Sequence, residues 1–362
     1  MLSITALCGL ERSDTGIVAS SVLLRDTRSV TVWVDPSSAF LGRMSATISD
    51  GVGWCESVEI DLDCECIGCG YLDALRTCVQ RVWQLQRYDL LVLQLAPSVE
   101  PDGVLESLCA TLDPEQARLD TVVGILRTGE WLDDLAGGDM LGERGLGINA
   151  EDDRPVSTMI ASQVGASDLI VLAGGIPTDT ELAALAALAP STPLLQDPDL
   201  LSLPMTTLAR TRRHQPRCLA AFEGDGLLDW SSTEPPHASG LQIVRWSATR
   251  PLHAERLYDA LEPISEDVIR SAGRIVIAST VDRWTRWESA GGSMSLGDLG
   301  PRAVVAAPHS RLTFLGPGLD AARITGLLDM CLLTDTELAA GPQAWQSYDD
   351  PFAVDLPDEE GS

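Results

Sequence analysis

Near its start the chain reads LSITALCGLERSDTG, residues 2–16, in which a short apolar run is followed by Gly9. An apolar run of this length, closed by a glycine, is typical of a buried strand. Similar runs recur through the first half of the chain, and the stretch 72–85 has the apolar spacing of a helix. Continuous apolar strands separated by helices predict a parallel sheet covered on both faces. The other runs lie at residues 30–34, 58–62, 90–95, 121–126 and 169–172.

The second half of the chain has a different pattern. Residues 204–240 are rich in proline, serine and threonine and carry a basic cluster at 210–217, which indicates a linker. From residue 241 to 338 strand and helix patterns alternate again, which predicts a small α+β domain with one sheet. Its expected strands are 241–246, 274–278, 284–288 and 312–315. The sequence therefore predicts a domain at 1–203, a linker at 204–240, a domain at 241–338 and an acidic tail at 339–362.

Charge and composition exclude several classes of protein. The 362 residues carry a formal net charge of −28 and include no lysine. Such a charge repels phosphate backbones, so no broad direct nucleic-acid surface is expected. No run approaches the roughly 18 apolar residues of a membrane helix, so no membrane partner is expected. The start of the chain lacks a basic region before an apolar one, which predicts a cytoplasmic protein, and the nine cysteines are expected to be reduced.

The segment after the first predicted strand departs from a phosphate-binding loop. A P-loop reads G-x-x-x-x-G-K-[ST], in which the lysine neutralises the phosphates and the hydroxyl holds magnesium. Aligned on Gly9, Asp14 replaces the second glycine, Thr15 replaces the lysine and Gly16 replaces the hydroxyl residue. The loop therefore lacks the groups that a P-loop nucleotide hydrolase needs.

Neighbouring charges add to this departure. Glu11 and Asp14 would face phosphate oxygens with like charge, which makes the loop repulsive to a triphosphate. Arg12 is the nearby cation that could compensate. We expect that GTP is not bound in the standard way and that the chain is not a P-loop GTPase.

A second group of candidate residues is the cysteine cluster Cys64, Cys66 and Cys69, which lies between a predicted strand and a predicted helix. Three thiolates within six residues can converge on one tetrahedral zinc ion, with a fourth ligand from Glu65, water or a partner. The alternative is that these are ordinary reduced cysteines near a turn, since free cysteines often serve as small apolar groups. The spacing favours zinc as the cofactor or cargo.

Several segments together resemble the CobW-type metallochaperone GTPases. They are residues 250–257, RPLHAERL; residues 268–274; residues 287–292; and residues 152–172 upstream. The resemblance covers most of the chain. It implies an α/β fold in which a P-loop-GTPase-like parallel sheet domain with a degenerate nucleotide site precedes a smaller α+β CobW C-terminal domain.

The resemblance also assigns roles to single positions. The G-C-x-C-C metal signature of the family matches at Cys66 and Cys69, while Gly68 stands where its middle cysteine would be. Gln94 takes the place of the Walker B acid, and residues 173–176 take the place of the guanine-reading loop without its aspartate. The resemblance therefore implies a zinc site with fewer cysteines and a nucleotide site without its main motifs.

One branch of the family fits the end of the chain. Residues 332–338 and 344–352 are similar to actinobacterial CobW-like proteins that bring a hibernation factor to the ribosome under zinc starvation. This likeness implies a non-catalytic recruitment factor whose partners are the ribosome and a hibernation factor. The alternatives are a zinc-binding metallochaperone with divergent or residual GTP binding, and a decayed paralogue without a role of its own.

Overall fold

The computed structural model describes residues 1–62, 66–196, 214, 235, 237–302 and 309–352. The chain divides into two compact units, Met1–Cys218 and Leu219–Ser362. Most of the predicted linker and the end of the predicted tail lie outside the described residues. Among the helices that are described, none has the length and apolar character to cross a membrane.

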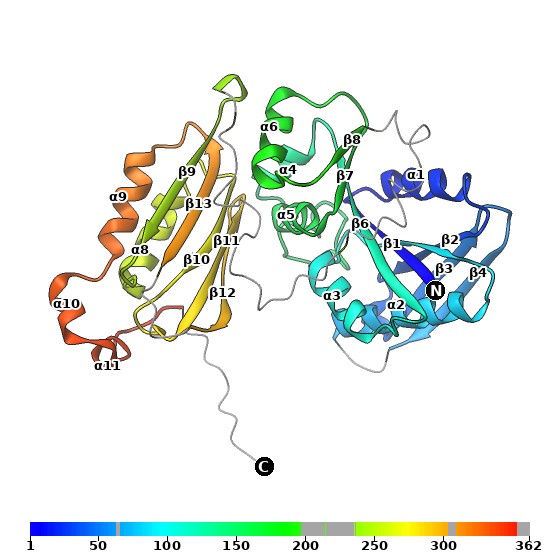
Figure 1. Ribbon diagram of the computed structural model, residues 1–362, viewed down its shortest axis with the longest axis horizontal. Coiled ribbons are helices and arrows are strands. Elements are labelled where there is room, and N and C mark those ends of the chain that lie inside the picture. Colours follow the sequence, from blue (N-terminus) through cyan, green and yellow to red (C-terminus); the bar gives the residue numbers. More distant parts are fainter. Residues whose placement is uncertain (63–65, 197–213, 215–234, 236, 303–308, 353–362) are drawn as a thin grey trace, which may run out of the picture. The chain divides into compact units, whose positions relative to one another are not determined.

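The N-terminal unit is built on a sheet with the strand order β4-β3-β2-β5-β1-β6-β7-β8 (Figure 1). The six strands from β2 to β8 in this order are parallel, as predicted, whereas β3 and β4 pair antiparallel at one edge. The predicted parallel sheet is therefore extended at one edge by two antiparallel strands, β3 and β4. The strands are β1 Leu2–Cys8, β2 Ser29–Asp35, β3 Arg43–Asp50, β4 Cys55–Asp61, β5 Leu90–Gln94, β6 Ala117–Arg127, β7 Leu169–Ala173 and β8 Leu194–Gln196.

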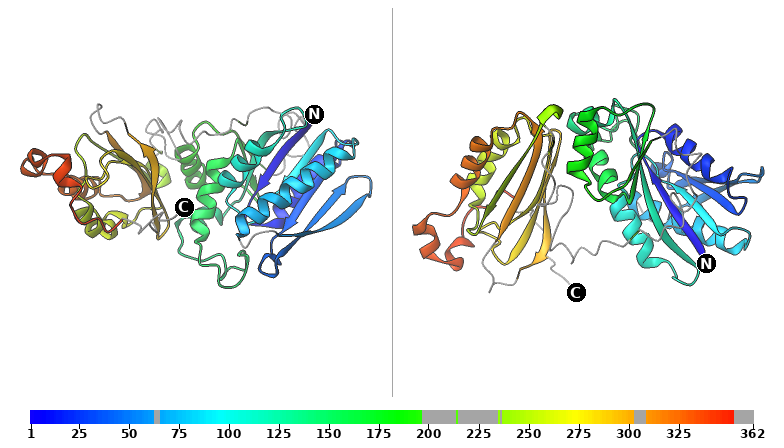
Figure 2. Two further views of the ribbon diagram at one scale, coloured as in Figure 1. Left: turned by 90° about the horizontal axis from the view of Figure 1, so that it is seen from below. Right: turned by 45° about the horizontal axis from the view of Figure 1, so that its top comes forward.

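Helices cover both faces of this sheet (Figure 2). Leu91 and Leu93 of β5 pack in the core that contains residues of α2 and α3, whereas Leu90 and Val92 pack in the core that contains residues of α1. Burial on both faces is the physical reason for the continuous apolar run in β5. The helices are α1 Arg12–Leu23, α2 Ile67–Gln84, α3 Pro101–Thr111, α4 Trp131–Ala136, α5 Val156–Ala166 and α6 Asp179–Leu188, with a 3-10 turn at Ala39–Leu41.

The C-terminal unit has one antiparallel sheet in the order β12-β11-β10-β13-β9, and its core contains residues of α8 and α9. Trp287 faces this core, and Trp284 lies on the opposite face, because strand residues three positions apart point to opposite sides of a sheet. The elements are β9 Leu241–Ala248, α8 Ala254–Ser265, β10 Arg270–Ile275, β11 Arg283–Ala290, β12 Ser293–Pro301, β13 Ser310–Pro317, α9 Ala321–Cys331, α10 Asp335–Ala340 and α11 Pro342–Trp345, with a 3-10 turn at His237–Ser239.

Two strands of this unit differ from the sequence prediction: one has other bounds, and the other was not predicted. The strand expected at 274–278 is β10, which ends at Ile275, and the apolar residues after it are buried beyond the end of the strand. The strand β12 was not predicted, because its sequence SMSLGDLGP is polar and rich in glycine. Pairing with β11 along one edge holds it in the sheet.

The segment after α9 packs back onto the C-terminal unit. The Glu337 carboxylate accepts hydrogen bonds from the Arg256 guanidinium at 2.9 and 3.0 Å, and these bonds lower the pKa of Glu337 to about 2. Trp345 is buried and donates to the Glu337 carbonyl, while the Tyr348 ring stacks on His253 at 5.0 Å. The described part of the predicted tail is therefore an ordered extension of this unit.

Candidate functional site

The connection between β1 and α1 is too short for a P-loop. The strand ends at Cys8 and the helix begins at Arg12, so three residues separate them. Arg12 and Ser13, which the alignment placed in the loop, lie in the helix. The Asp14 and Thr15 backbone N–H groups donate to the Glu11 carbonyl at 3.1 and 3.3 Å, as in a helix start. These N–H groups are therefore not directed at a phosphate cradle.

Asp14 does not face an open phosphate site, which corrects the sequence prediction. The Arg127 guanidinium, at the end of β6, donates to the Asp14 carboxylate at 2.8 and 3.1 Å. Although burial lowers the pKa of Arg127, the charge of Asp14 raises it overall. The buried carboxylate is thus neutralised within the protein, and sequence gave no signal for this pair because 113 residues separate its members.

The remaining polar groups at this helix start are also used internally. The Thr15 hydroxyl donates to the Arg12 carbonyl at 3.0 Å and is buried. Gln94, at the Walker B position, donates to the Thr31 hydroxyl at 2.8 Å. The Arg12 guanidinium, the predicted compensating cation, lies 4.3 Å from the centre of the Trp33 ring.

Two glycines near the start of α1 differ in how closely they are packed. A side chain at Gly9 would place its Cβ 2.8 Å from the Ile125 carbonyl, so the glycine is needed for close approach of the backbone to β6. Gly16 has no neighbour within 4 Å of such a position and lies in the first turns of α1. Of the four predicted loop residues, Gly9, Asp14 and Thr15 therefore serve helix and strand packing, and Gly16 is a position in α1 with open space beside it.

The start of α2 places two of the predicted cysteines together. Cys66 is the N-cap of the helix, and Cys69 lies three residues further on. Both are exposed and neither forms a disulfide. The Cys69 backbone N–H, the Cys69 thiol and the Gly68 backbone N–H bond the Cys66 sulfur, and they lower the pKa of Cys66 from its ordinary value of 9.0. Hydrogen bonds to a thiolate at a helix N-terminus make it a better metal ligand and nucleophile.

Cys64 and Glu65, the other predicted ligands, lie outside the described residues. Within the described part of the chain, no group of three or more histidine, cysteine or acidic side chains is placed to hold a metal ion. Two thiol ligands are therefore brought together here.

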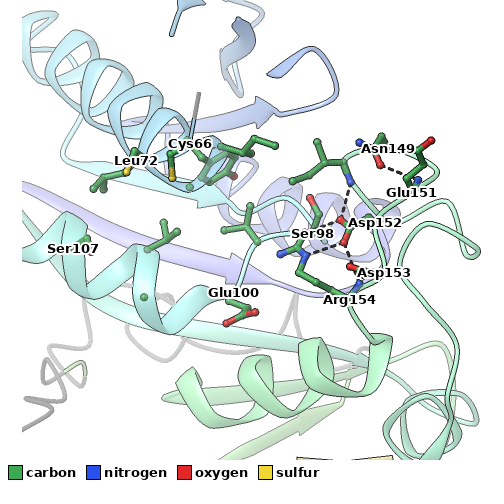
Figure 3. Close-up of a pocket in the computed structure, with 18 residues that line it drawn as sticks. Cys66, Leu72, Ser98, Glu100, Ser107, Asn149, Glu151, Asp152, Asp153 and Arg154 are labelled. Carbon is green, nitrogen blue, oxygen red and sulfur yellow. Dashed lines mark hydrogen bonds and ion pairs between the residues drawn. The ribbon is translucent and has the colours of Figure 1, made fainter. Parts of the chain in front are cut away.

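A cavity of about 740 Å³ lies beside the two thiols (Figure 3). Its walls come from the start of α2, the start of α3 and the connection at residues 148–154. Ile67, Leu72, Val99, Val104 and Ile148 supply apolar surface. Glu100, Glu151, Asp153 and Arg154 supply charged groups. The sequence does not indicate this cavity, because three separate segments form it.

Asp152 orders the connection that closes the cavity. Its carboxylate accepts hydrogen bonds from the Arg154 guanidinium at 2.7 and 2.9 Å and from the Ile148 backbone N–H at 3.1 Å. The Arg154 bonds lower the pKa of Asp152 against the effect of burial. Tyr71 supports the opposite wall, where its buried hydroxyl accepts from the Ala96 backbone N–H at 3.0 Å.

A histidine–aspartate pair that the sequence did not indicate lies elsewhere in this unit. His214 Nδ1 is 3.1 Å from Asp168 Oδ2, and the His214 backbone N–H donates to the Asp120 carbonyl. Although burial lowers the pKa of His214, hydrogen bonds to Asp168 and Cys109 raise it from 6.5 to about 9. This contact fixes one residue of the predicted linker to the N-terminal unit.

Comparisons with known proteins bear on this arrangement. Residues 241–332 match the family model described as the cobalamin synthesis protein cobW C-terminal domain. The C-terminal unit carries a CobW C-terminal domain. The expected fold class is thereby confirmed: an α/β unit with a largely parallel sheet and a separate CobW C-terminal unit with an antiparallel sheet.

Relatives along the whole chain point the same way. The chain is 28% identical over 379 residues to a Mycobacterium tuberculosis protein named as a zinc chaperone, covering 92% of this chain and 89% of the relative. It is 24% identical over 336 residues to zinc-regulated GTPase metalloprotein activator 1 of Dictyostelium discoideum, covering 82% and 70%. These matches support the resemblance to CobW-type proteins.

Among solved structures, the Zn(II)-bound YjiA GTPase of E. coli is similar, with 13% identity, a TM-score of 0.40 and coverage of 92% of this chain and 99% of that one.

Proposed function

We propose that this chain is a CobW-type zinc-handling protein that binds zinc as cargo and does not hydrolyse GTP at a P-loop. The observation that carries the proposal is the start of α2, where the exposed thiols of Cys66 and Cys69 lie beside a cavity. The names of the relatives, a zinc chaperone and a zinc-regulated GTPase metalloprotein activator, support zinc as the metal.

The ligand types at this site suit a zinc ion that is passed to another protein. Thiolates are soft ligands that favour zinc over magnesium or calcium. Cys66 and Cys69 would supply two thiolates and Cys64 a third, which leaves a fourth position for water or for a ligand of an acceptor protein. Their exposure allows such an acceptor to reach the metal.

The start of α1 supports the second part of the proposal. The Asp14 carboxylate is paired with Arg127, and the first helical N–H groups bond the Glu11 carbonyl. A triphosphate there would find no lysine, and the nearby Arg127 guanidinium is already paired with Asp14. Isothermal titration with GTP and magnesium tests this directly, and we expect no binding at micromolar concentration.

The zinc site is tested by metal content and affinity. We expect about one zinc per wild-type chain after dialysis against a weak chelator, and loss of that zinc in Cys66→Ser and Cys69→Ser. Cys64→Ser tests the third ligand. Cys55→Ser is the matched control, because Cys55 is also exposed but lies on β4. Unchanged zinc content in Cys66→Ser would remove the proposal.

A second candidate function is recruitment of a hibernation factor to the ribosome. The observation that favours it is the segment at residues 332–352, which resembles the recruiting branch of the family and folds against the C-terminal unit through Glu337, Trp345 and Tyr348. Co-sedimentation with ribosomes from zinc-starved cells tests it. Loss of sedimentation in an Arg256→Gln variant, with Arg283→Gln as control, would tie the activity to this segment.

A further inference from the structure

Residues from three distant parts of the N-terminal unit meet beside β6. Cys109 lies near the end of α3, Asp168 lies between α5 and β7, and His214 lies 46 residues further along the chain. His214 Nδ1 is 3.1 Å from Asp168 Oδ2, and the same ring hydrogen-bonds the Cys109 thiol. We call these three residues the Cys–His–Asp cluster. It lies outside the proposed zinc site and the residues that line its cavity.

Backbone contacts hold the cluster in place. The His214 backbone N–H donates to the Asp120 carbonyl of β6 at 3.0 Å. The Asp168 carboxylate accepts from the Val122 backbone N–H at 2.8 Å and also faces the His214 ring, so its orientation toward the imidazole is fixed. A histidine that is oriented by a carboxylate and bonded to a thiol is the arrangement that activates a nucleophilic cysteine.

The charges of the cluster favour a reactive thiol. Although burial lowers the pKa of His214, the two titratable groups that face its ring, Asp168 and Cys109, raise it to about 9. The imidazole is therefore protonated at neutral pH, with Asp168 as its counter-ion. A protonated histidine beside a cysteine favours the thiolate, which is the nucleophilic form.

The burial of the cluster limits what can reach it. Cys109 is half-buried, and the side chains of His214 and Asp168 are 12% and 17% exposed. A substrate that needs a broad approach, such as a peptide, would meet mostly covered atoms. A small oxidant needs only the partial opening at the sulfur, and a thiolate with a nearby cation reacts readily with a peroxide.

We propose that Cys109 is an oxidation site at which hydrogen peroxide converts the thiol to a sulfenic acid. The Cys109 thiolate attacks one peroxide oxygen, so that an S–O bond forms and the O–O bond breaks. The sulfur is oxidised and the peroxide is reduced. The departing hydroxide takes a proton from the His214 imidazolium and becomes water. Asp168 keeps its charge throughout and acts as a positioning residue, and a thiol reductant restores the cysteine.

The experiment uses zinc-free full-length protein and dilute hydrogen peroxide at pH 7. Peptide mass spectrometry follows the loss of free thiol at each cysteine, and a dimedone adduct at Cys109 identifies the sulfenic acid. We expect Cys109 to be oxidised at least tenfold faster than Cys55, which is exposed on β4, because exposure alone does not supply a thiolate. His214→Gln and Asp168→Asn should each slow Cys109 at least fivefold, whereas the control His309→Gln should not.

The same measurement at pH 10 separates activation of the thiol from a change in its exposure. Thiols are largely ionised there without a neighbouring cation, so Cys109 should be oxidised at similar rates in wild type and His214→Gln. Buried Cys78 reports on unfolding, and if it reacts in His214→Gln, the comparison is made with Asp168→Asn.

Three outcomes would overturn the proposal. The first is a Cys109 rate at pH 7 that is no higher than the Cys55 rate. The second is a Cys109 rate that His214→Gln leaves unchanged at pH 7. The third is a loss of equal size at pH 7 and pH 10, because His214 would then act on the exposure of Cys109 and not on its ionisation.

Discussion

Two helices of the N-terminal unit, α1 and α2, follow strands that run in the same direction, β1 and β4. They use their first turns differently. At α1, the acidic side chain is buried against Arg127 and the polar groups bond within the protein. At α2, the two thiols are exposed beside a cavity. The difference teaches that two helix starts in one unit can be used in opposite ways, one for an internal ion pair and the other for exposed thiols.

The contrast between α1 and α2 depends on the contribution of the Asp14–Arg127 pair to stability. Removing this pair has the largest expected effect. Arg127→Ala leaves a carboxylate that is 8% exposed without its cation. We expect the free energy of unfolding of the N-terminal unit to fall by about 3 kcal/mol, measured by urea denaturation. Arg76→Ala removes an exposed pair with Asp73 and should cost less than about 0.5 kcal/mol. Equal effects in the two variants would contradict the prediction.

His214 extends the comparison, because it forms a second, partly buried ion pair with Asp168 in the same unit. Its pKa of about 9 exceeds the ordinary 6.5, so its stabilising contribution is complete below about pH 6.5 and is lost as the pH rises through about 9. We expect wild type to exceed His214→Gln in free energy of unfolding by about 2–3 kcal/mol at pH 6, and the gap to close by pH 10.

The control for this pH dependence is His309→Gln, since His309 is exposed. It should leave the urea midpoint unchanged at both pH values. A gap between wild type and His214→Gln that stays constant from pH 6 to pH 10 would show that the histidine acts by packing alone.

The reactivity of Cys66 tests whether the thiols at the start of α2 are accessible. Its lowered pKa makes the thiolate available below the ordinary value of 9.0. In zinc-free protein at pH 7, we expect iodoacetamide to alkylate Cys66 several-fold faster than Cys55, as followed by peptide mass spectrometry. Zinc should protect Cys66 and leave Cys55 unaffected. Equal alkylation rates at Cys66 and Cys55 would contradict the lowered pKa of Cys66.

A conventional helix start gives the smallest expected effect. At α6 the Thr178 hydroxyl accepts from the Glu181 backbone N–H, and the Glu181 carboxylate accepts from the Thr178 backbone N–H. Thr178→Ala should lower the free energy of unfolding by about 1 kcal/mol. A loss as large as that of Arg127→Ala would mean that caps and buried pairs contribute alike in this unit.

Sequence predicted those parts of the fold that local pattern determines. Apolar runs marked β1, β2, β5, β6 and β7 because a strand buried on both faces must be apolar along its length. The strands β3 and β12 were missed, since each has a polar or glycine-rich sequence and is held by its neighbour in the sheet.

The candidate site was predicted in part for the same reason. The cysteines were visible because three lie within six residues, whereas their cavity depends on residues near 100 and 150. Asp14 was identified as a change from the P-loop pattern, but its partner Arg127 lies 113 residues away, and no local rule links the two. Contacts between distant segments are therefore what the sequence could not supply.

The three-residue connection between β1 and α1 determines which changes would be needed to form a P-loop here. Replacing Thr15 by lysine would restore a cation, but it would leave Arg12 and Ser13 wound into the helix. A phosphate-binding loop would require inserted residues or an unwound first turn, together with removal of Asp14 from Arg127. Each of these changes is unfavourable while the others are missing, so no single substitution would build such a loop here.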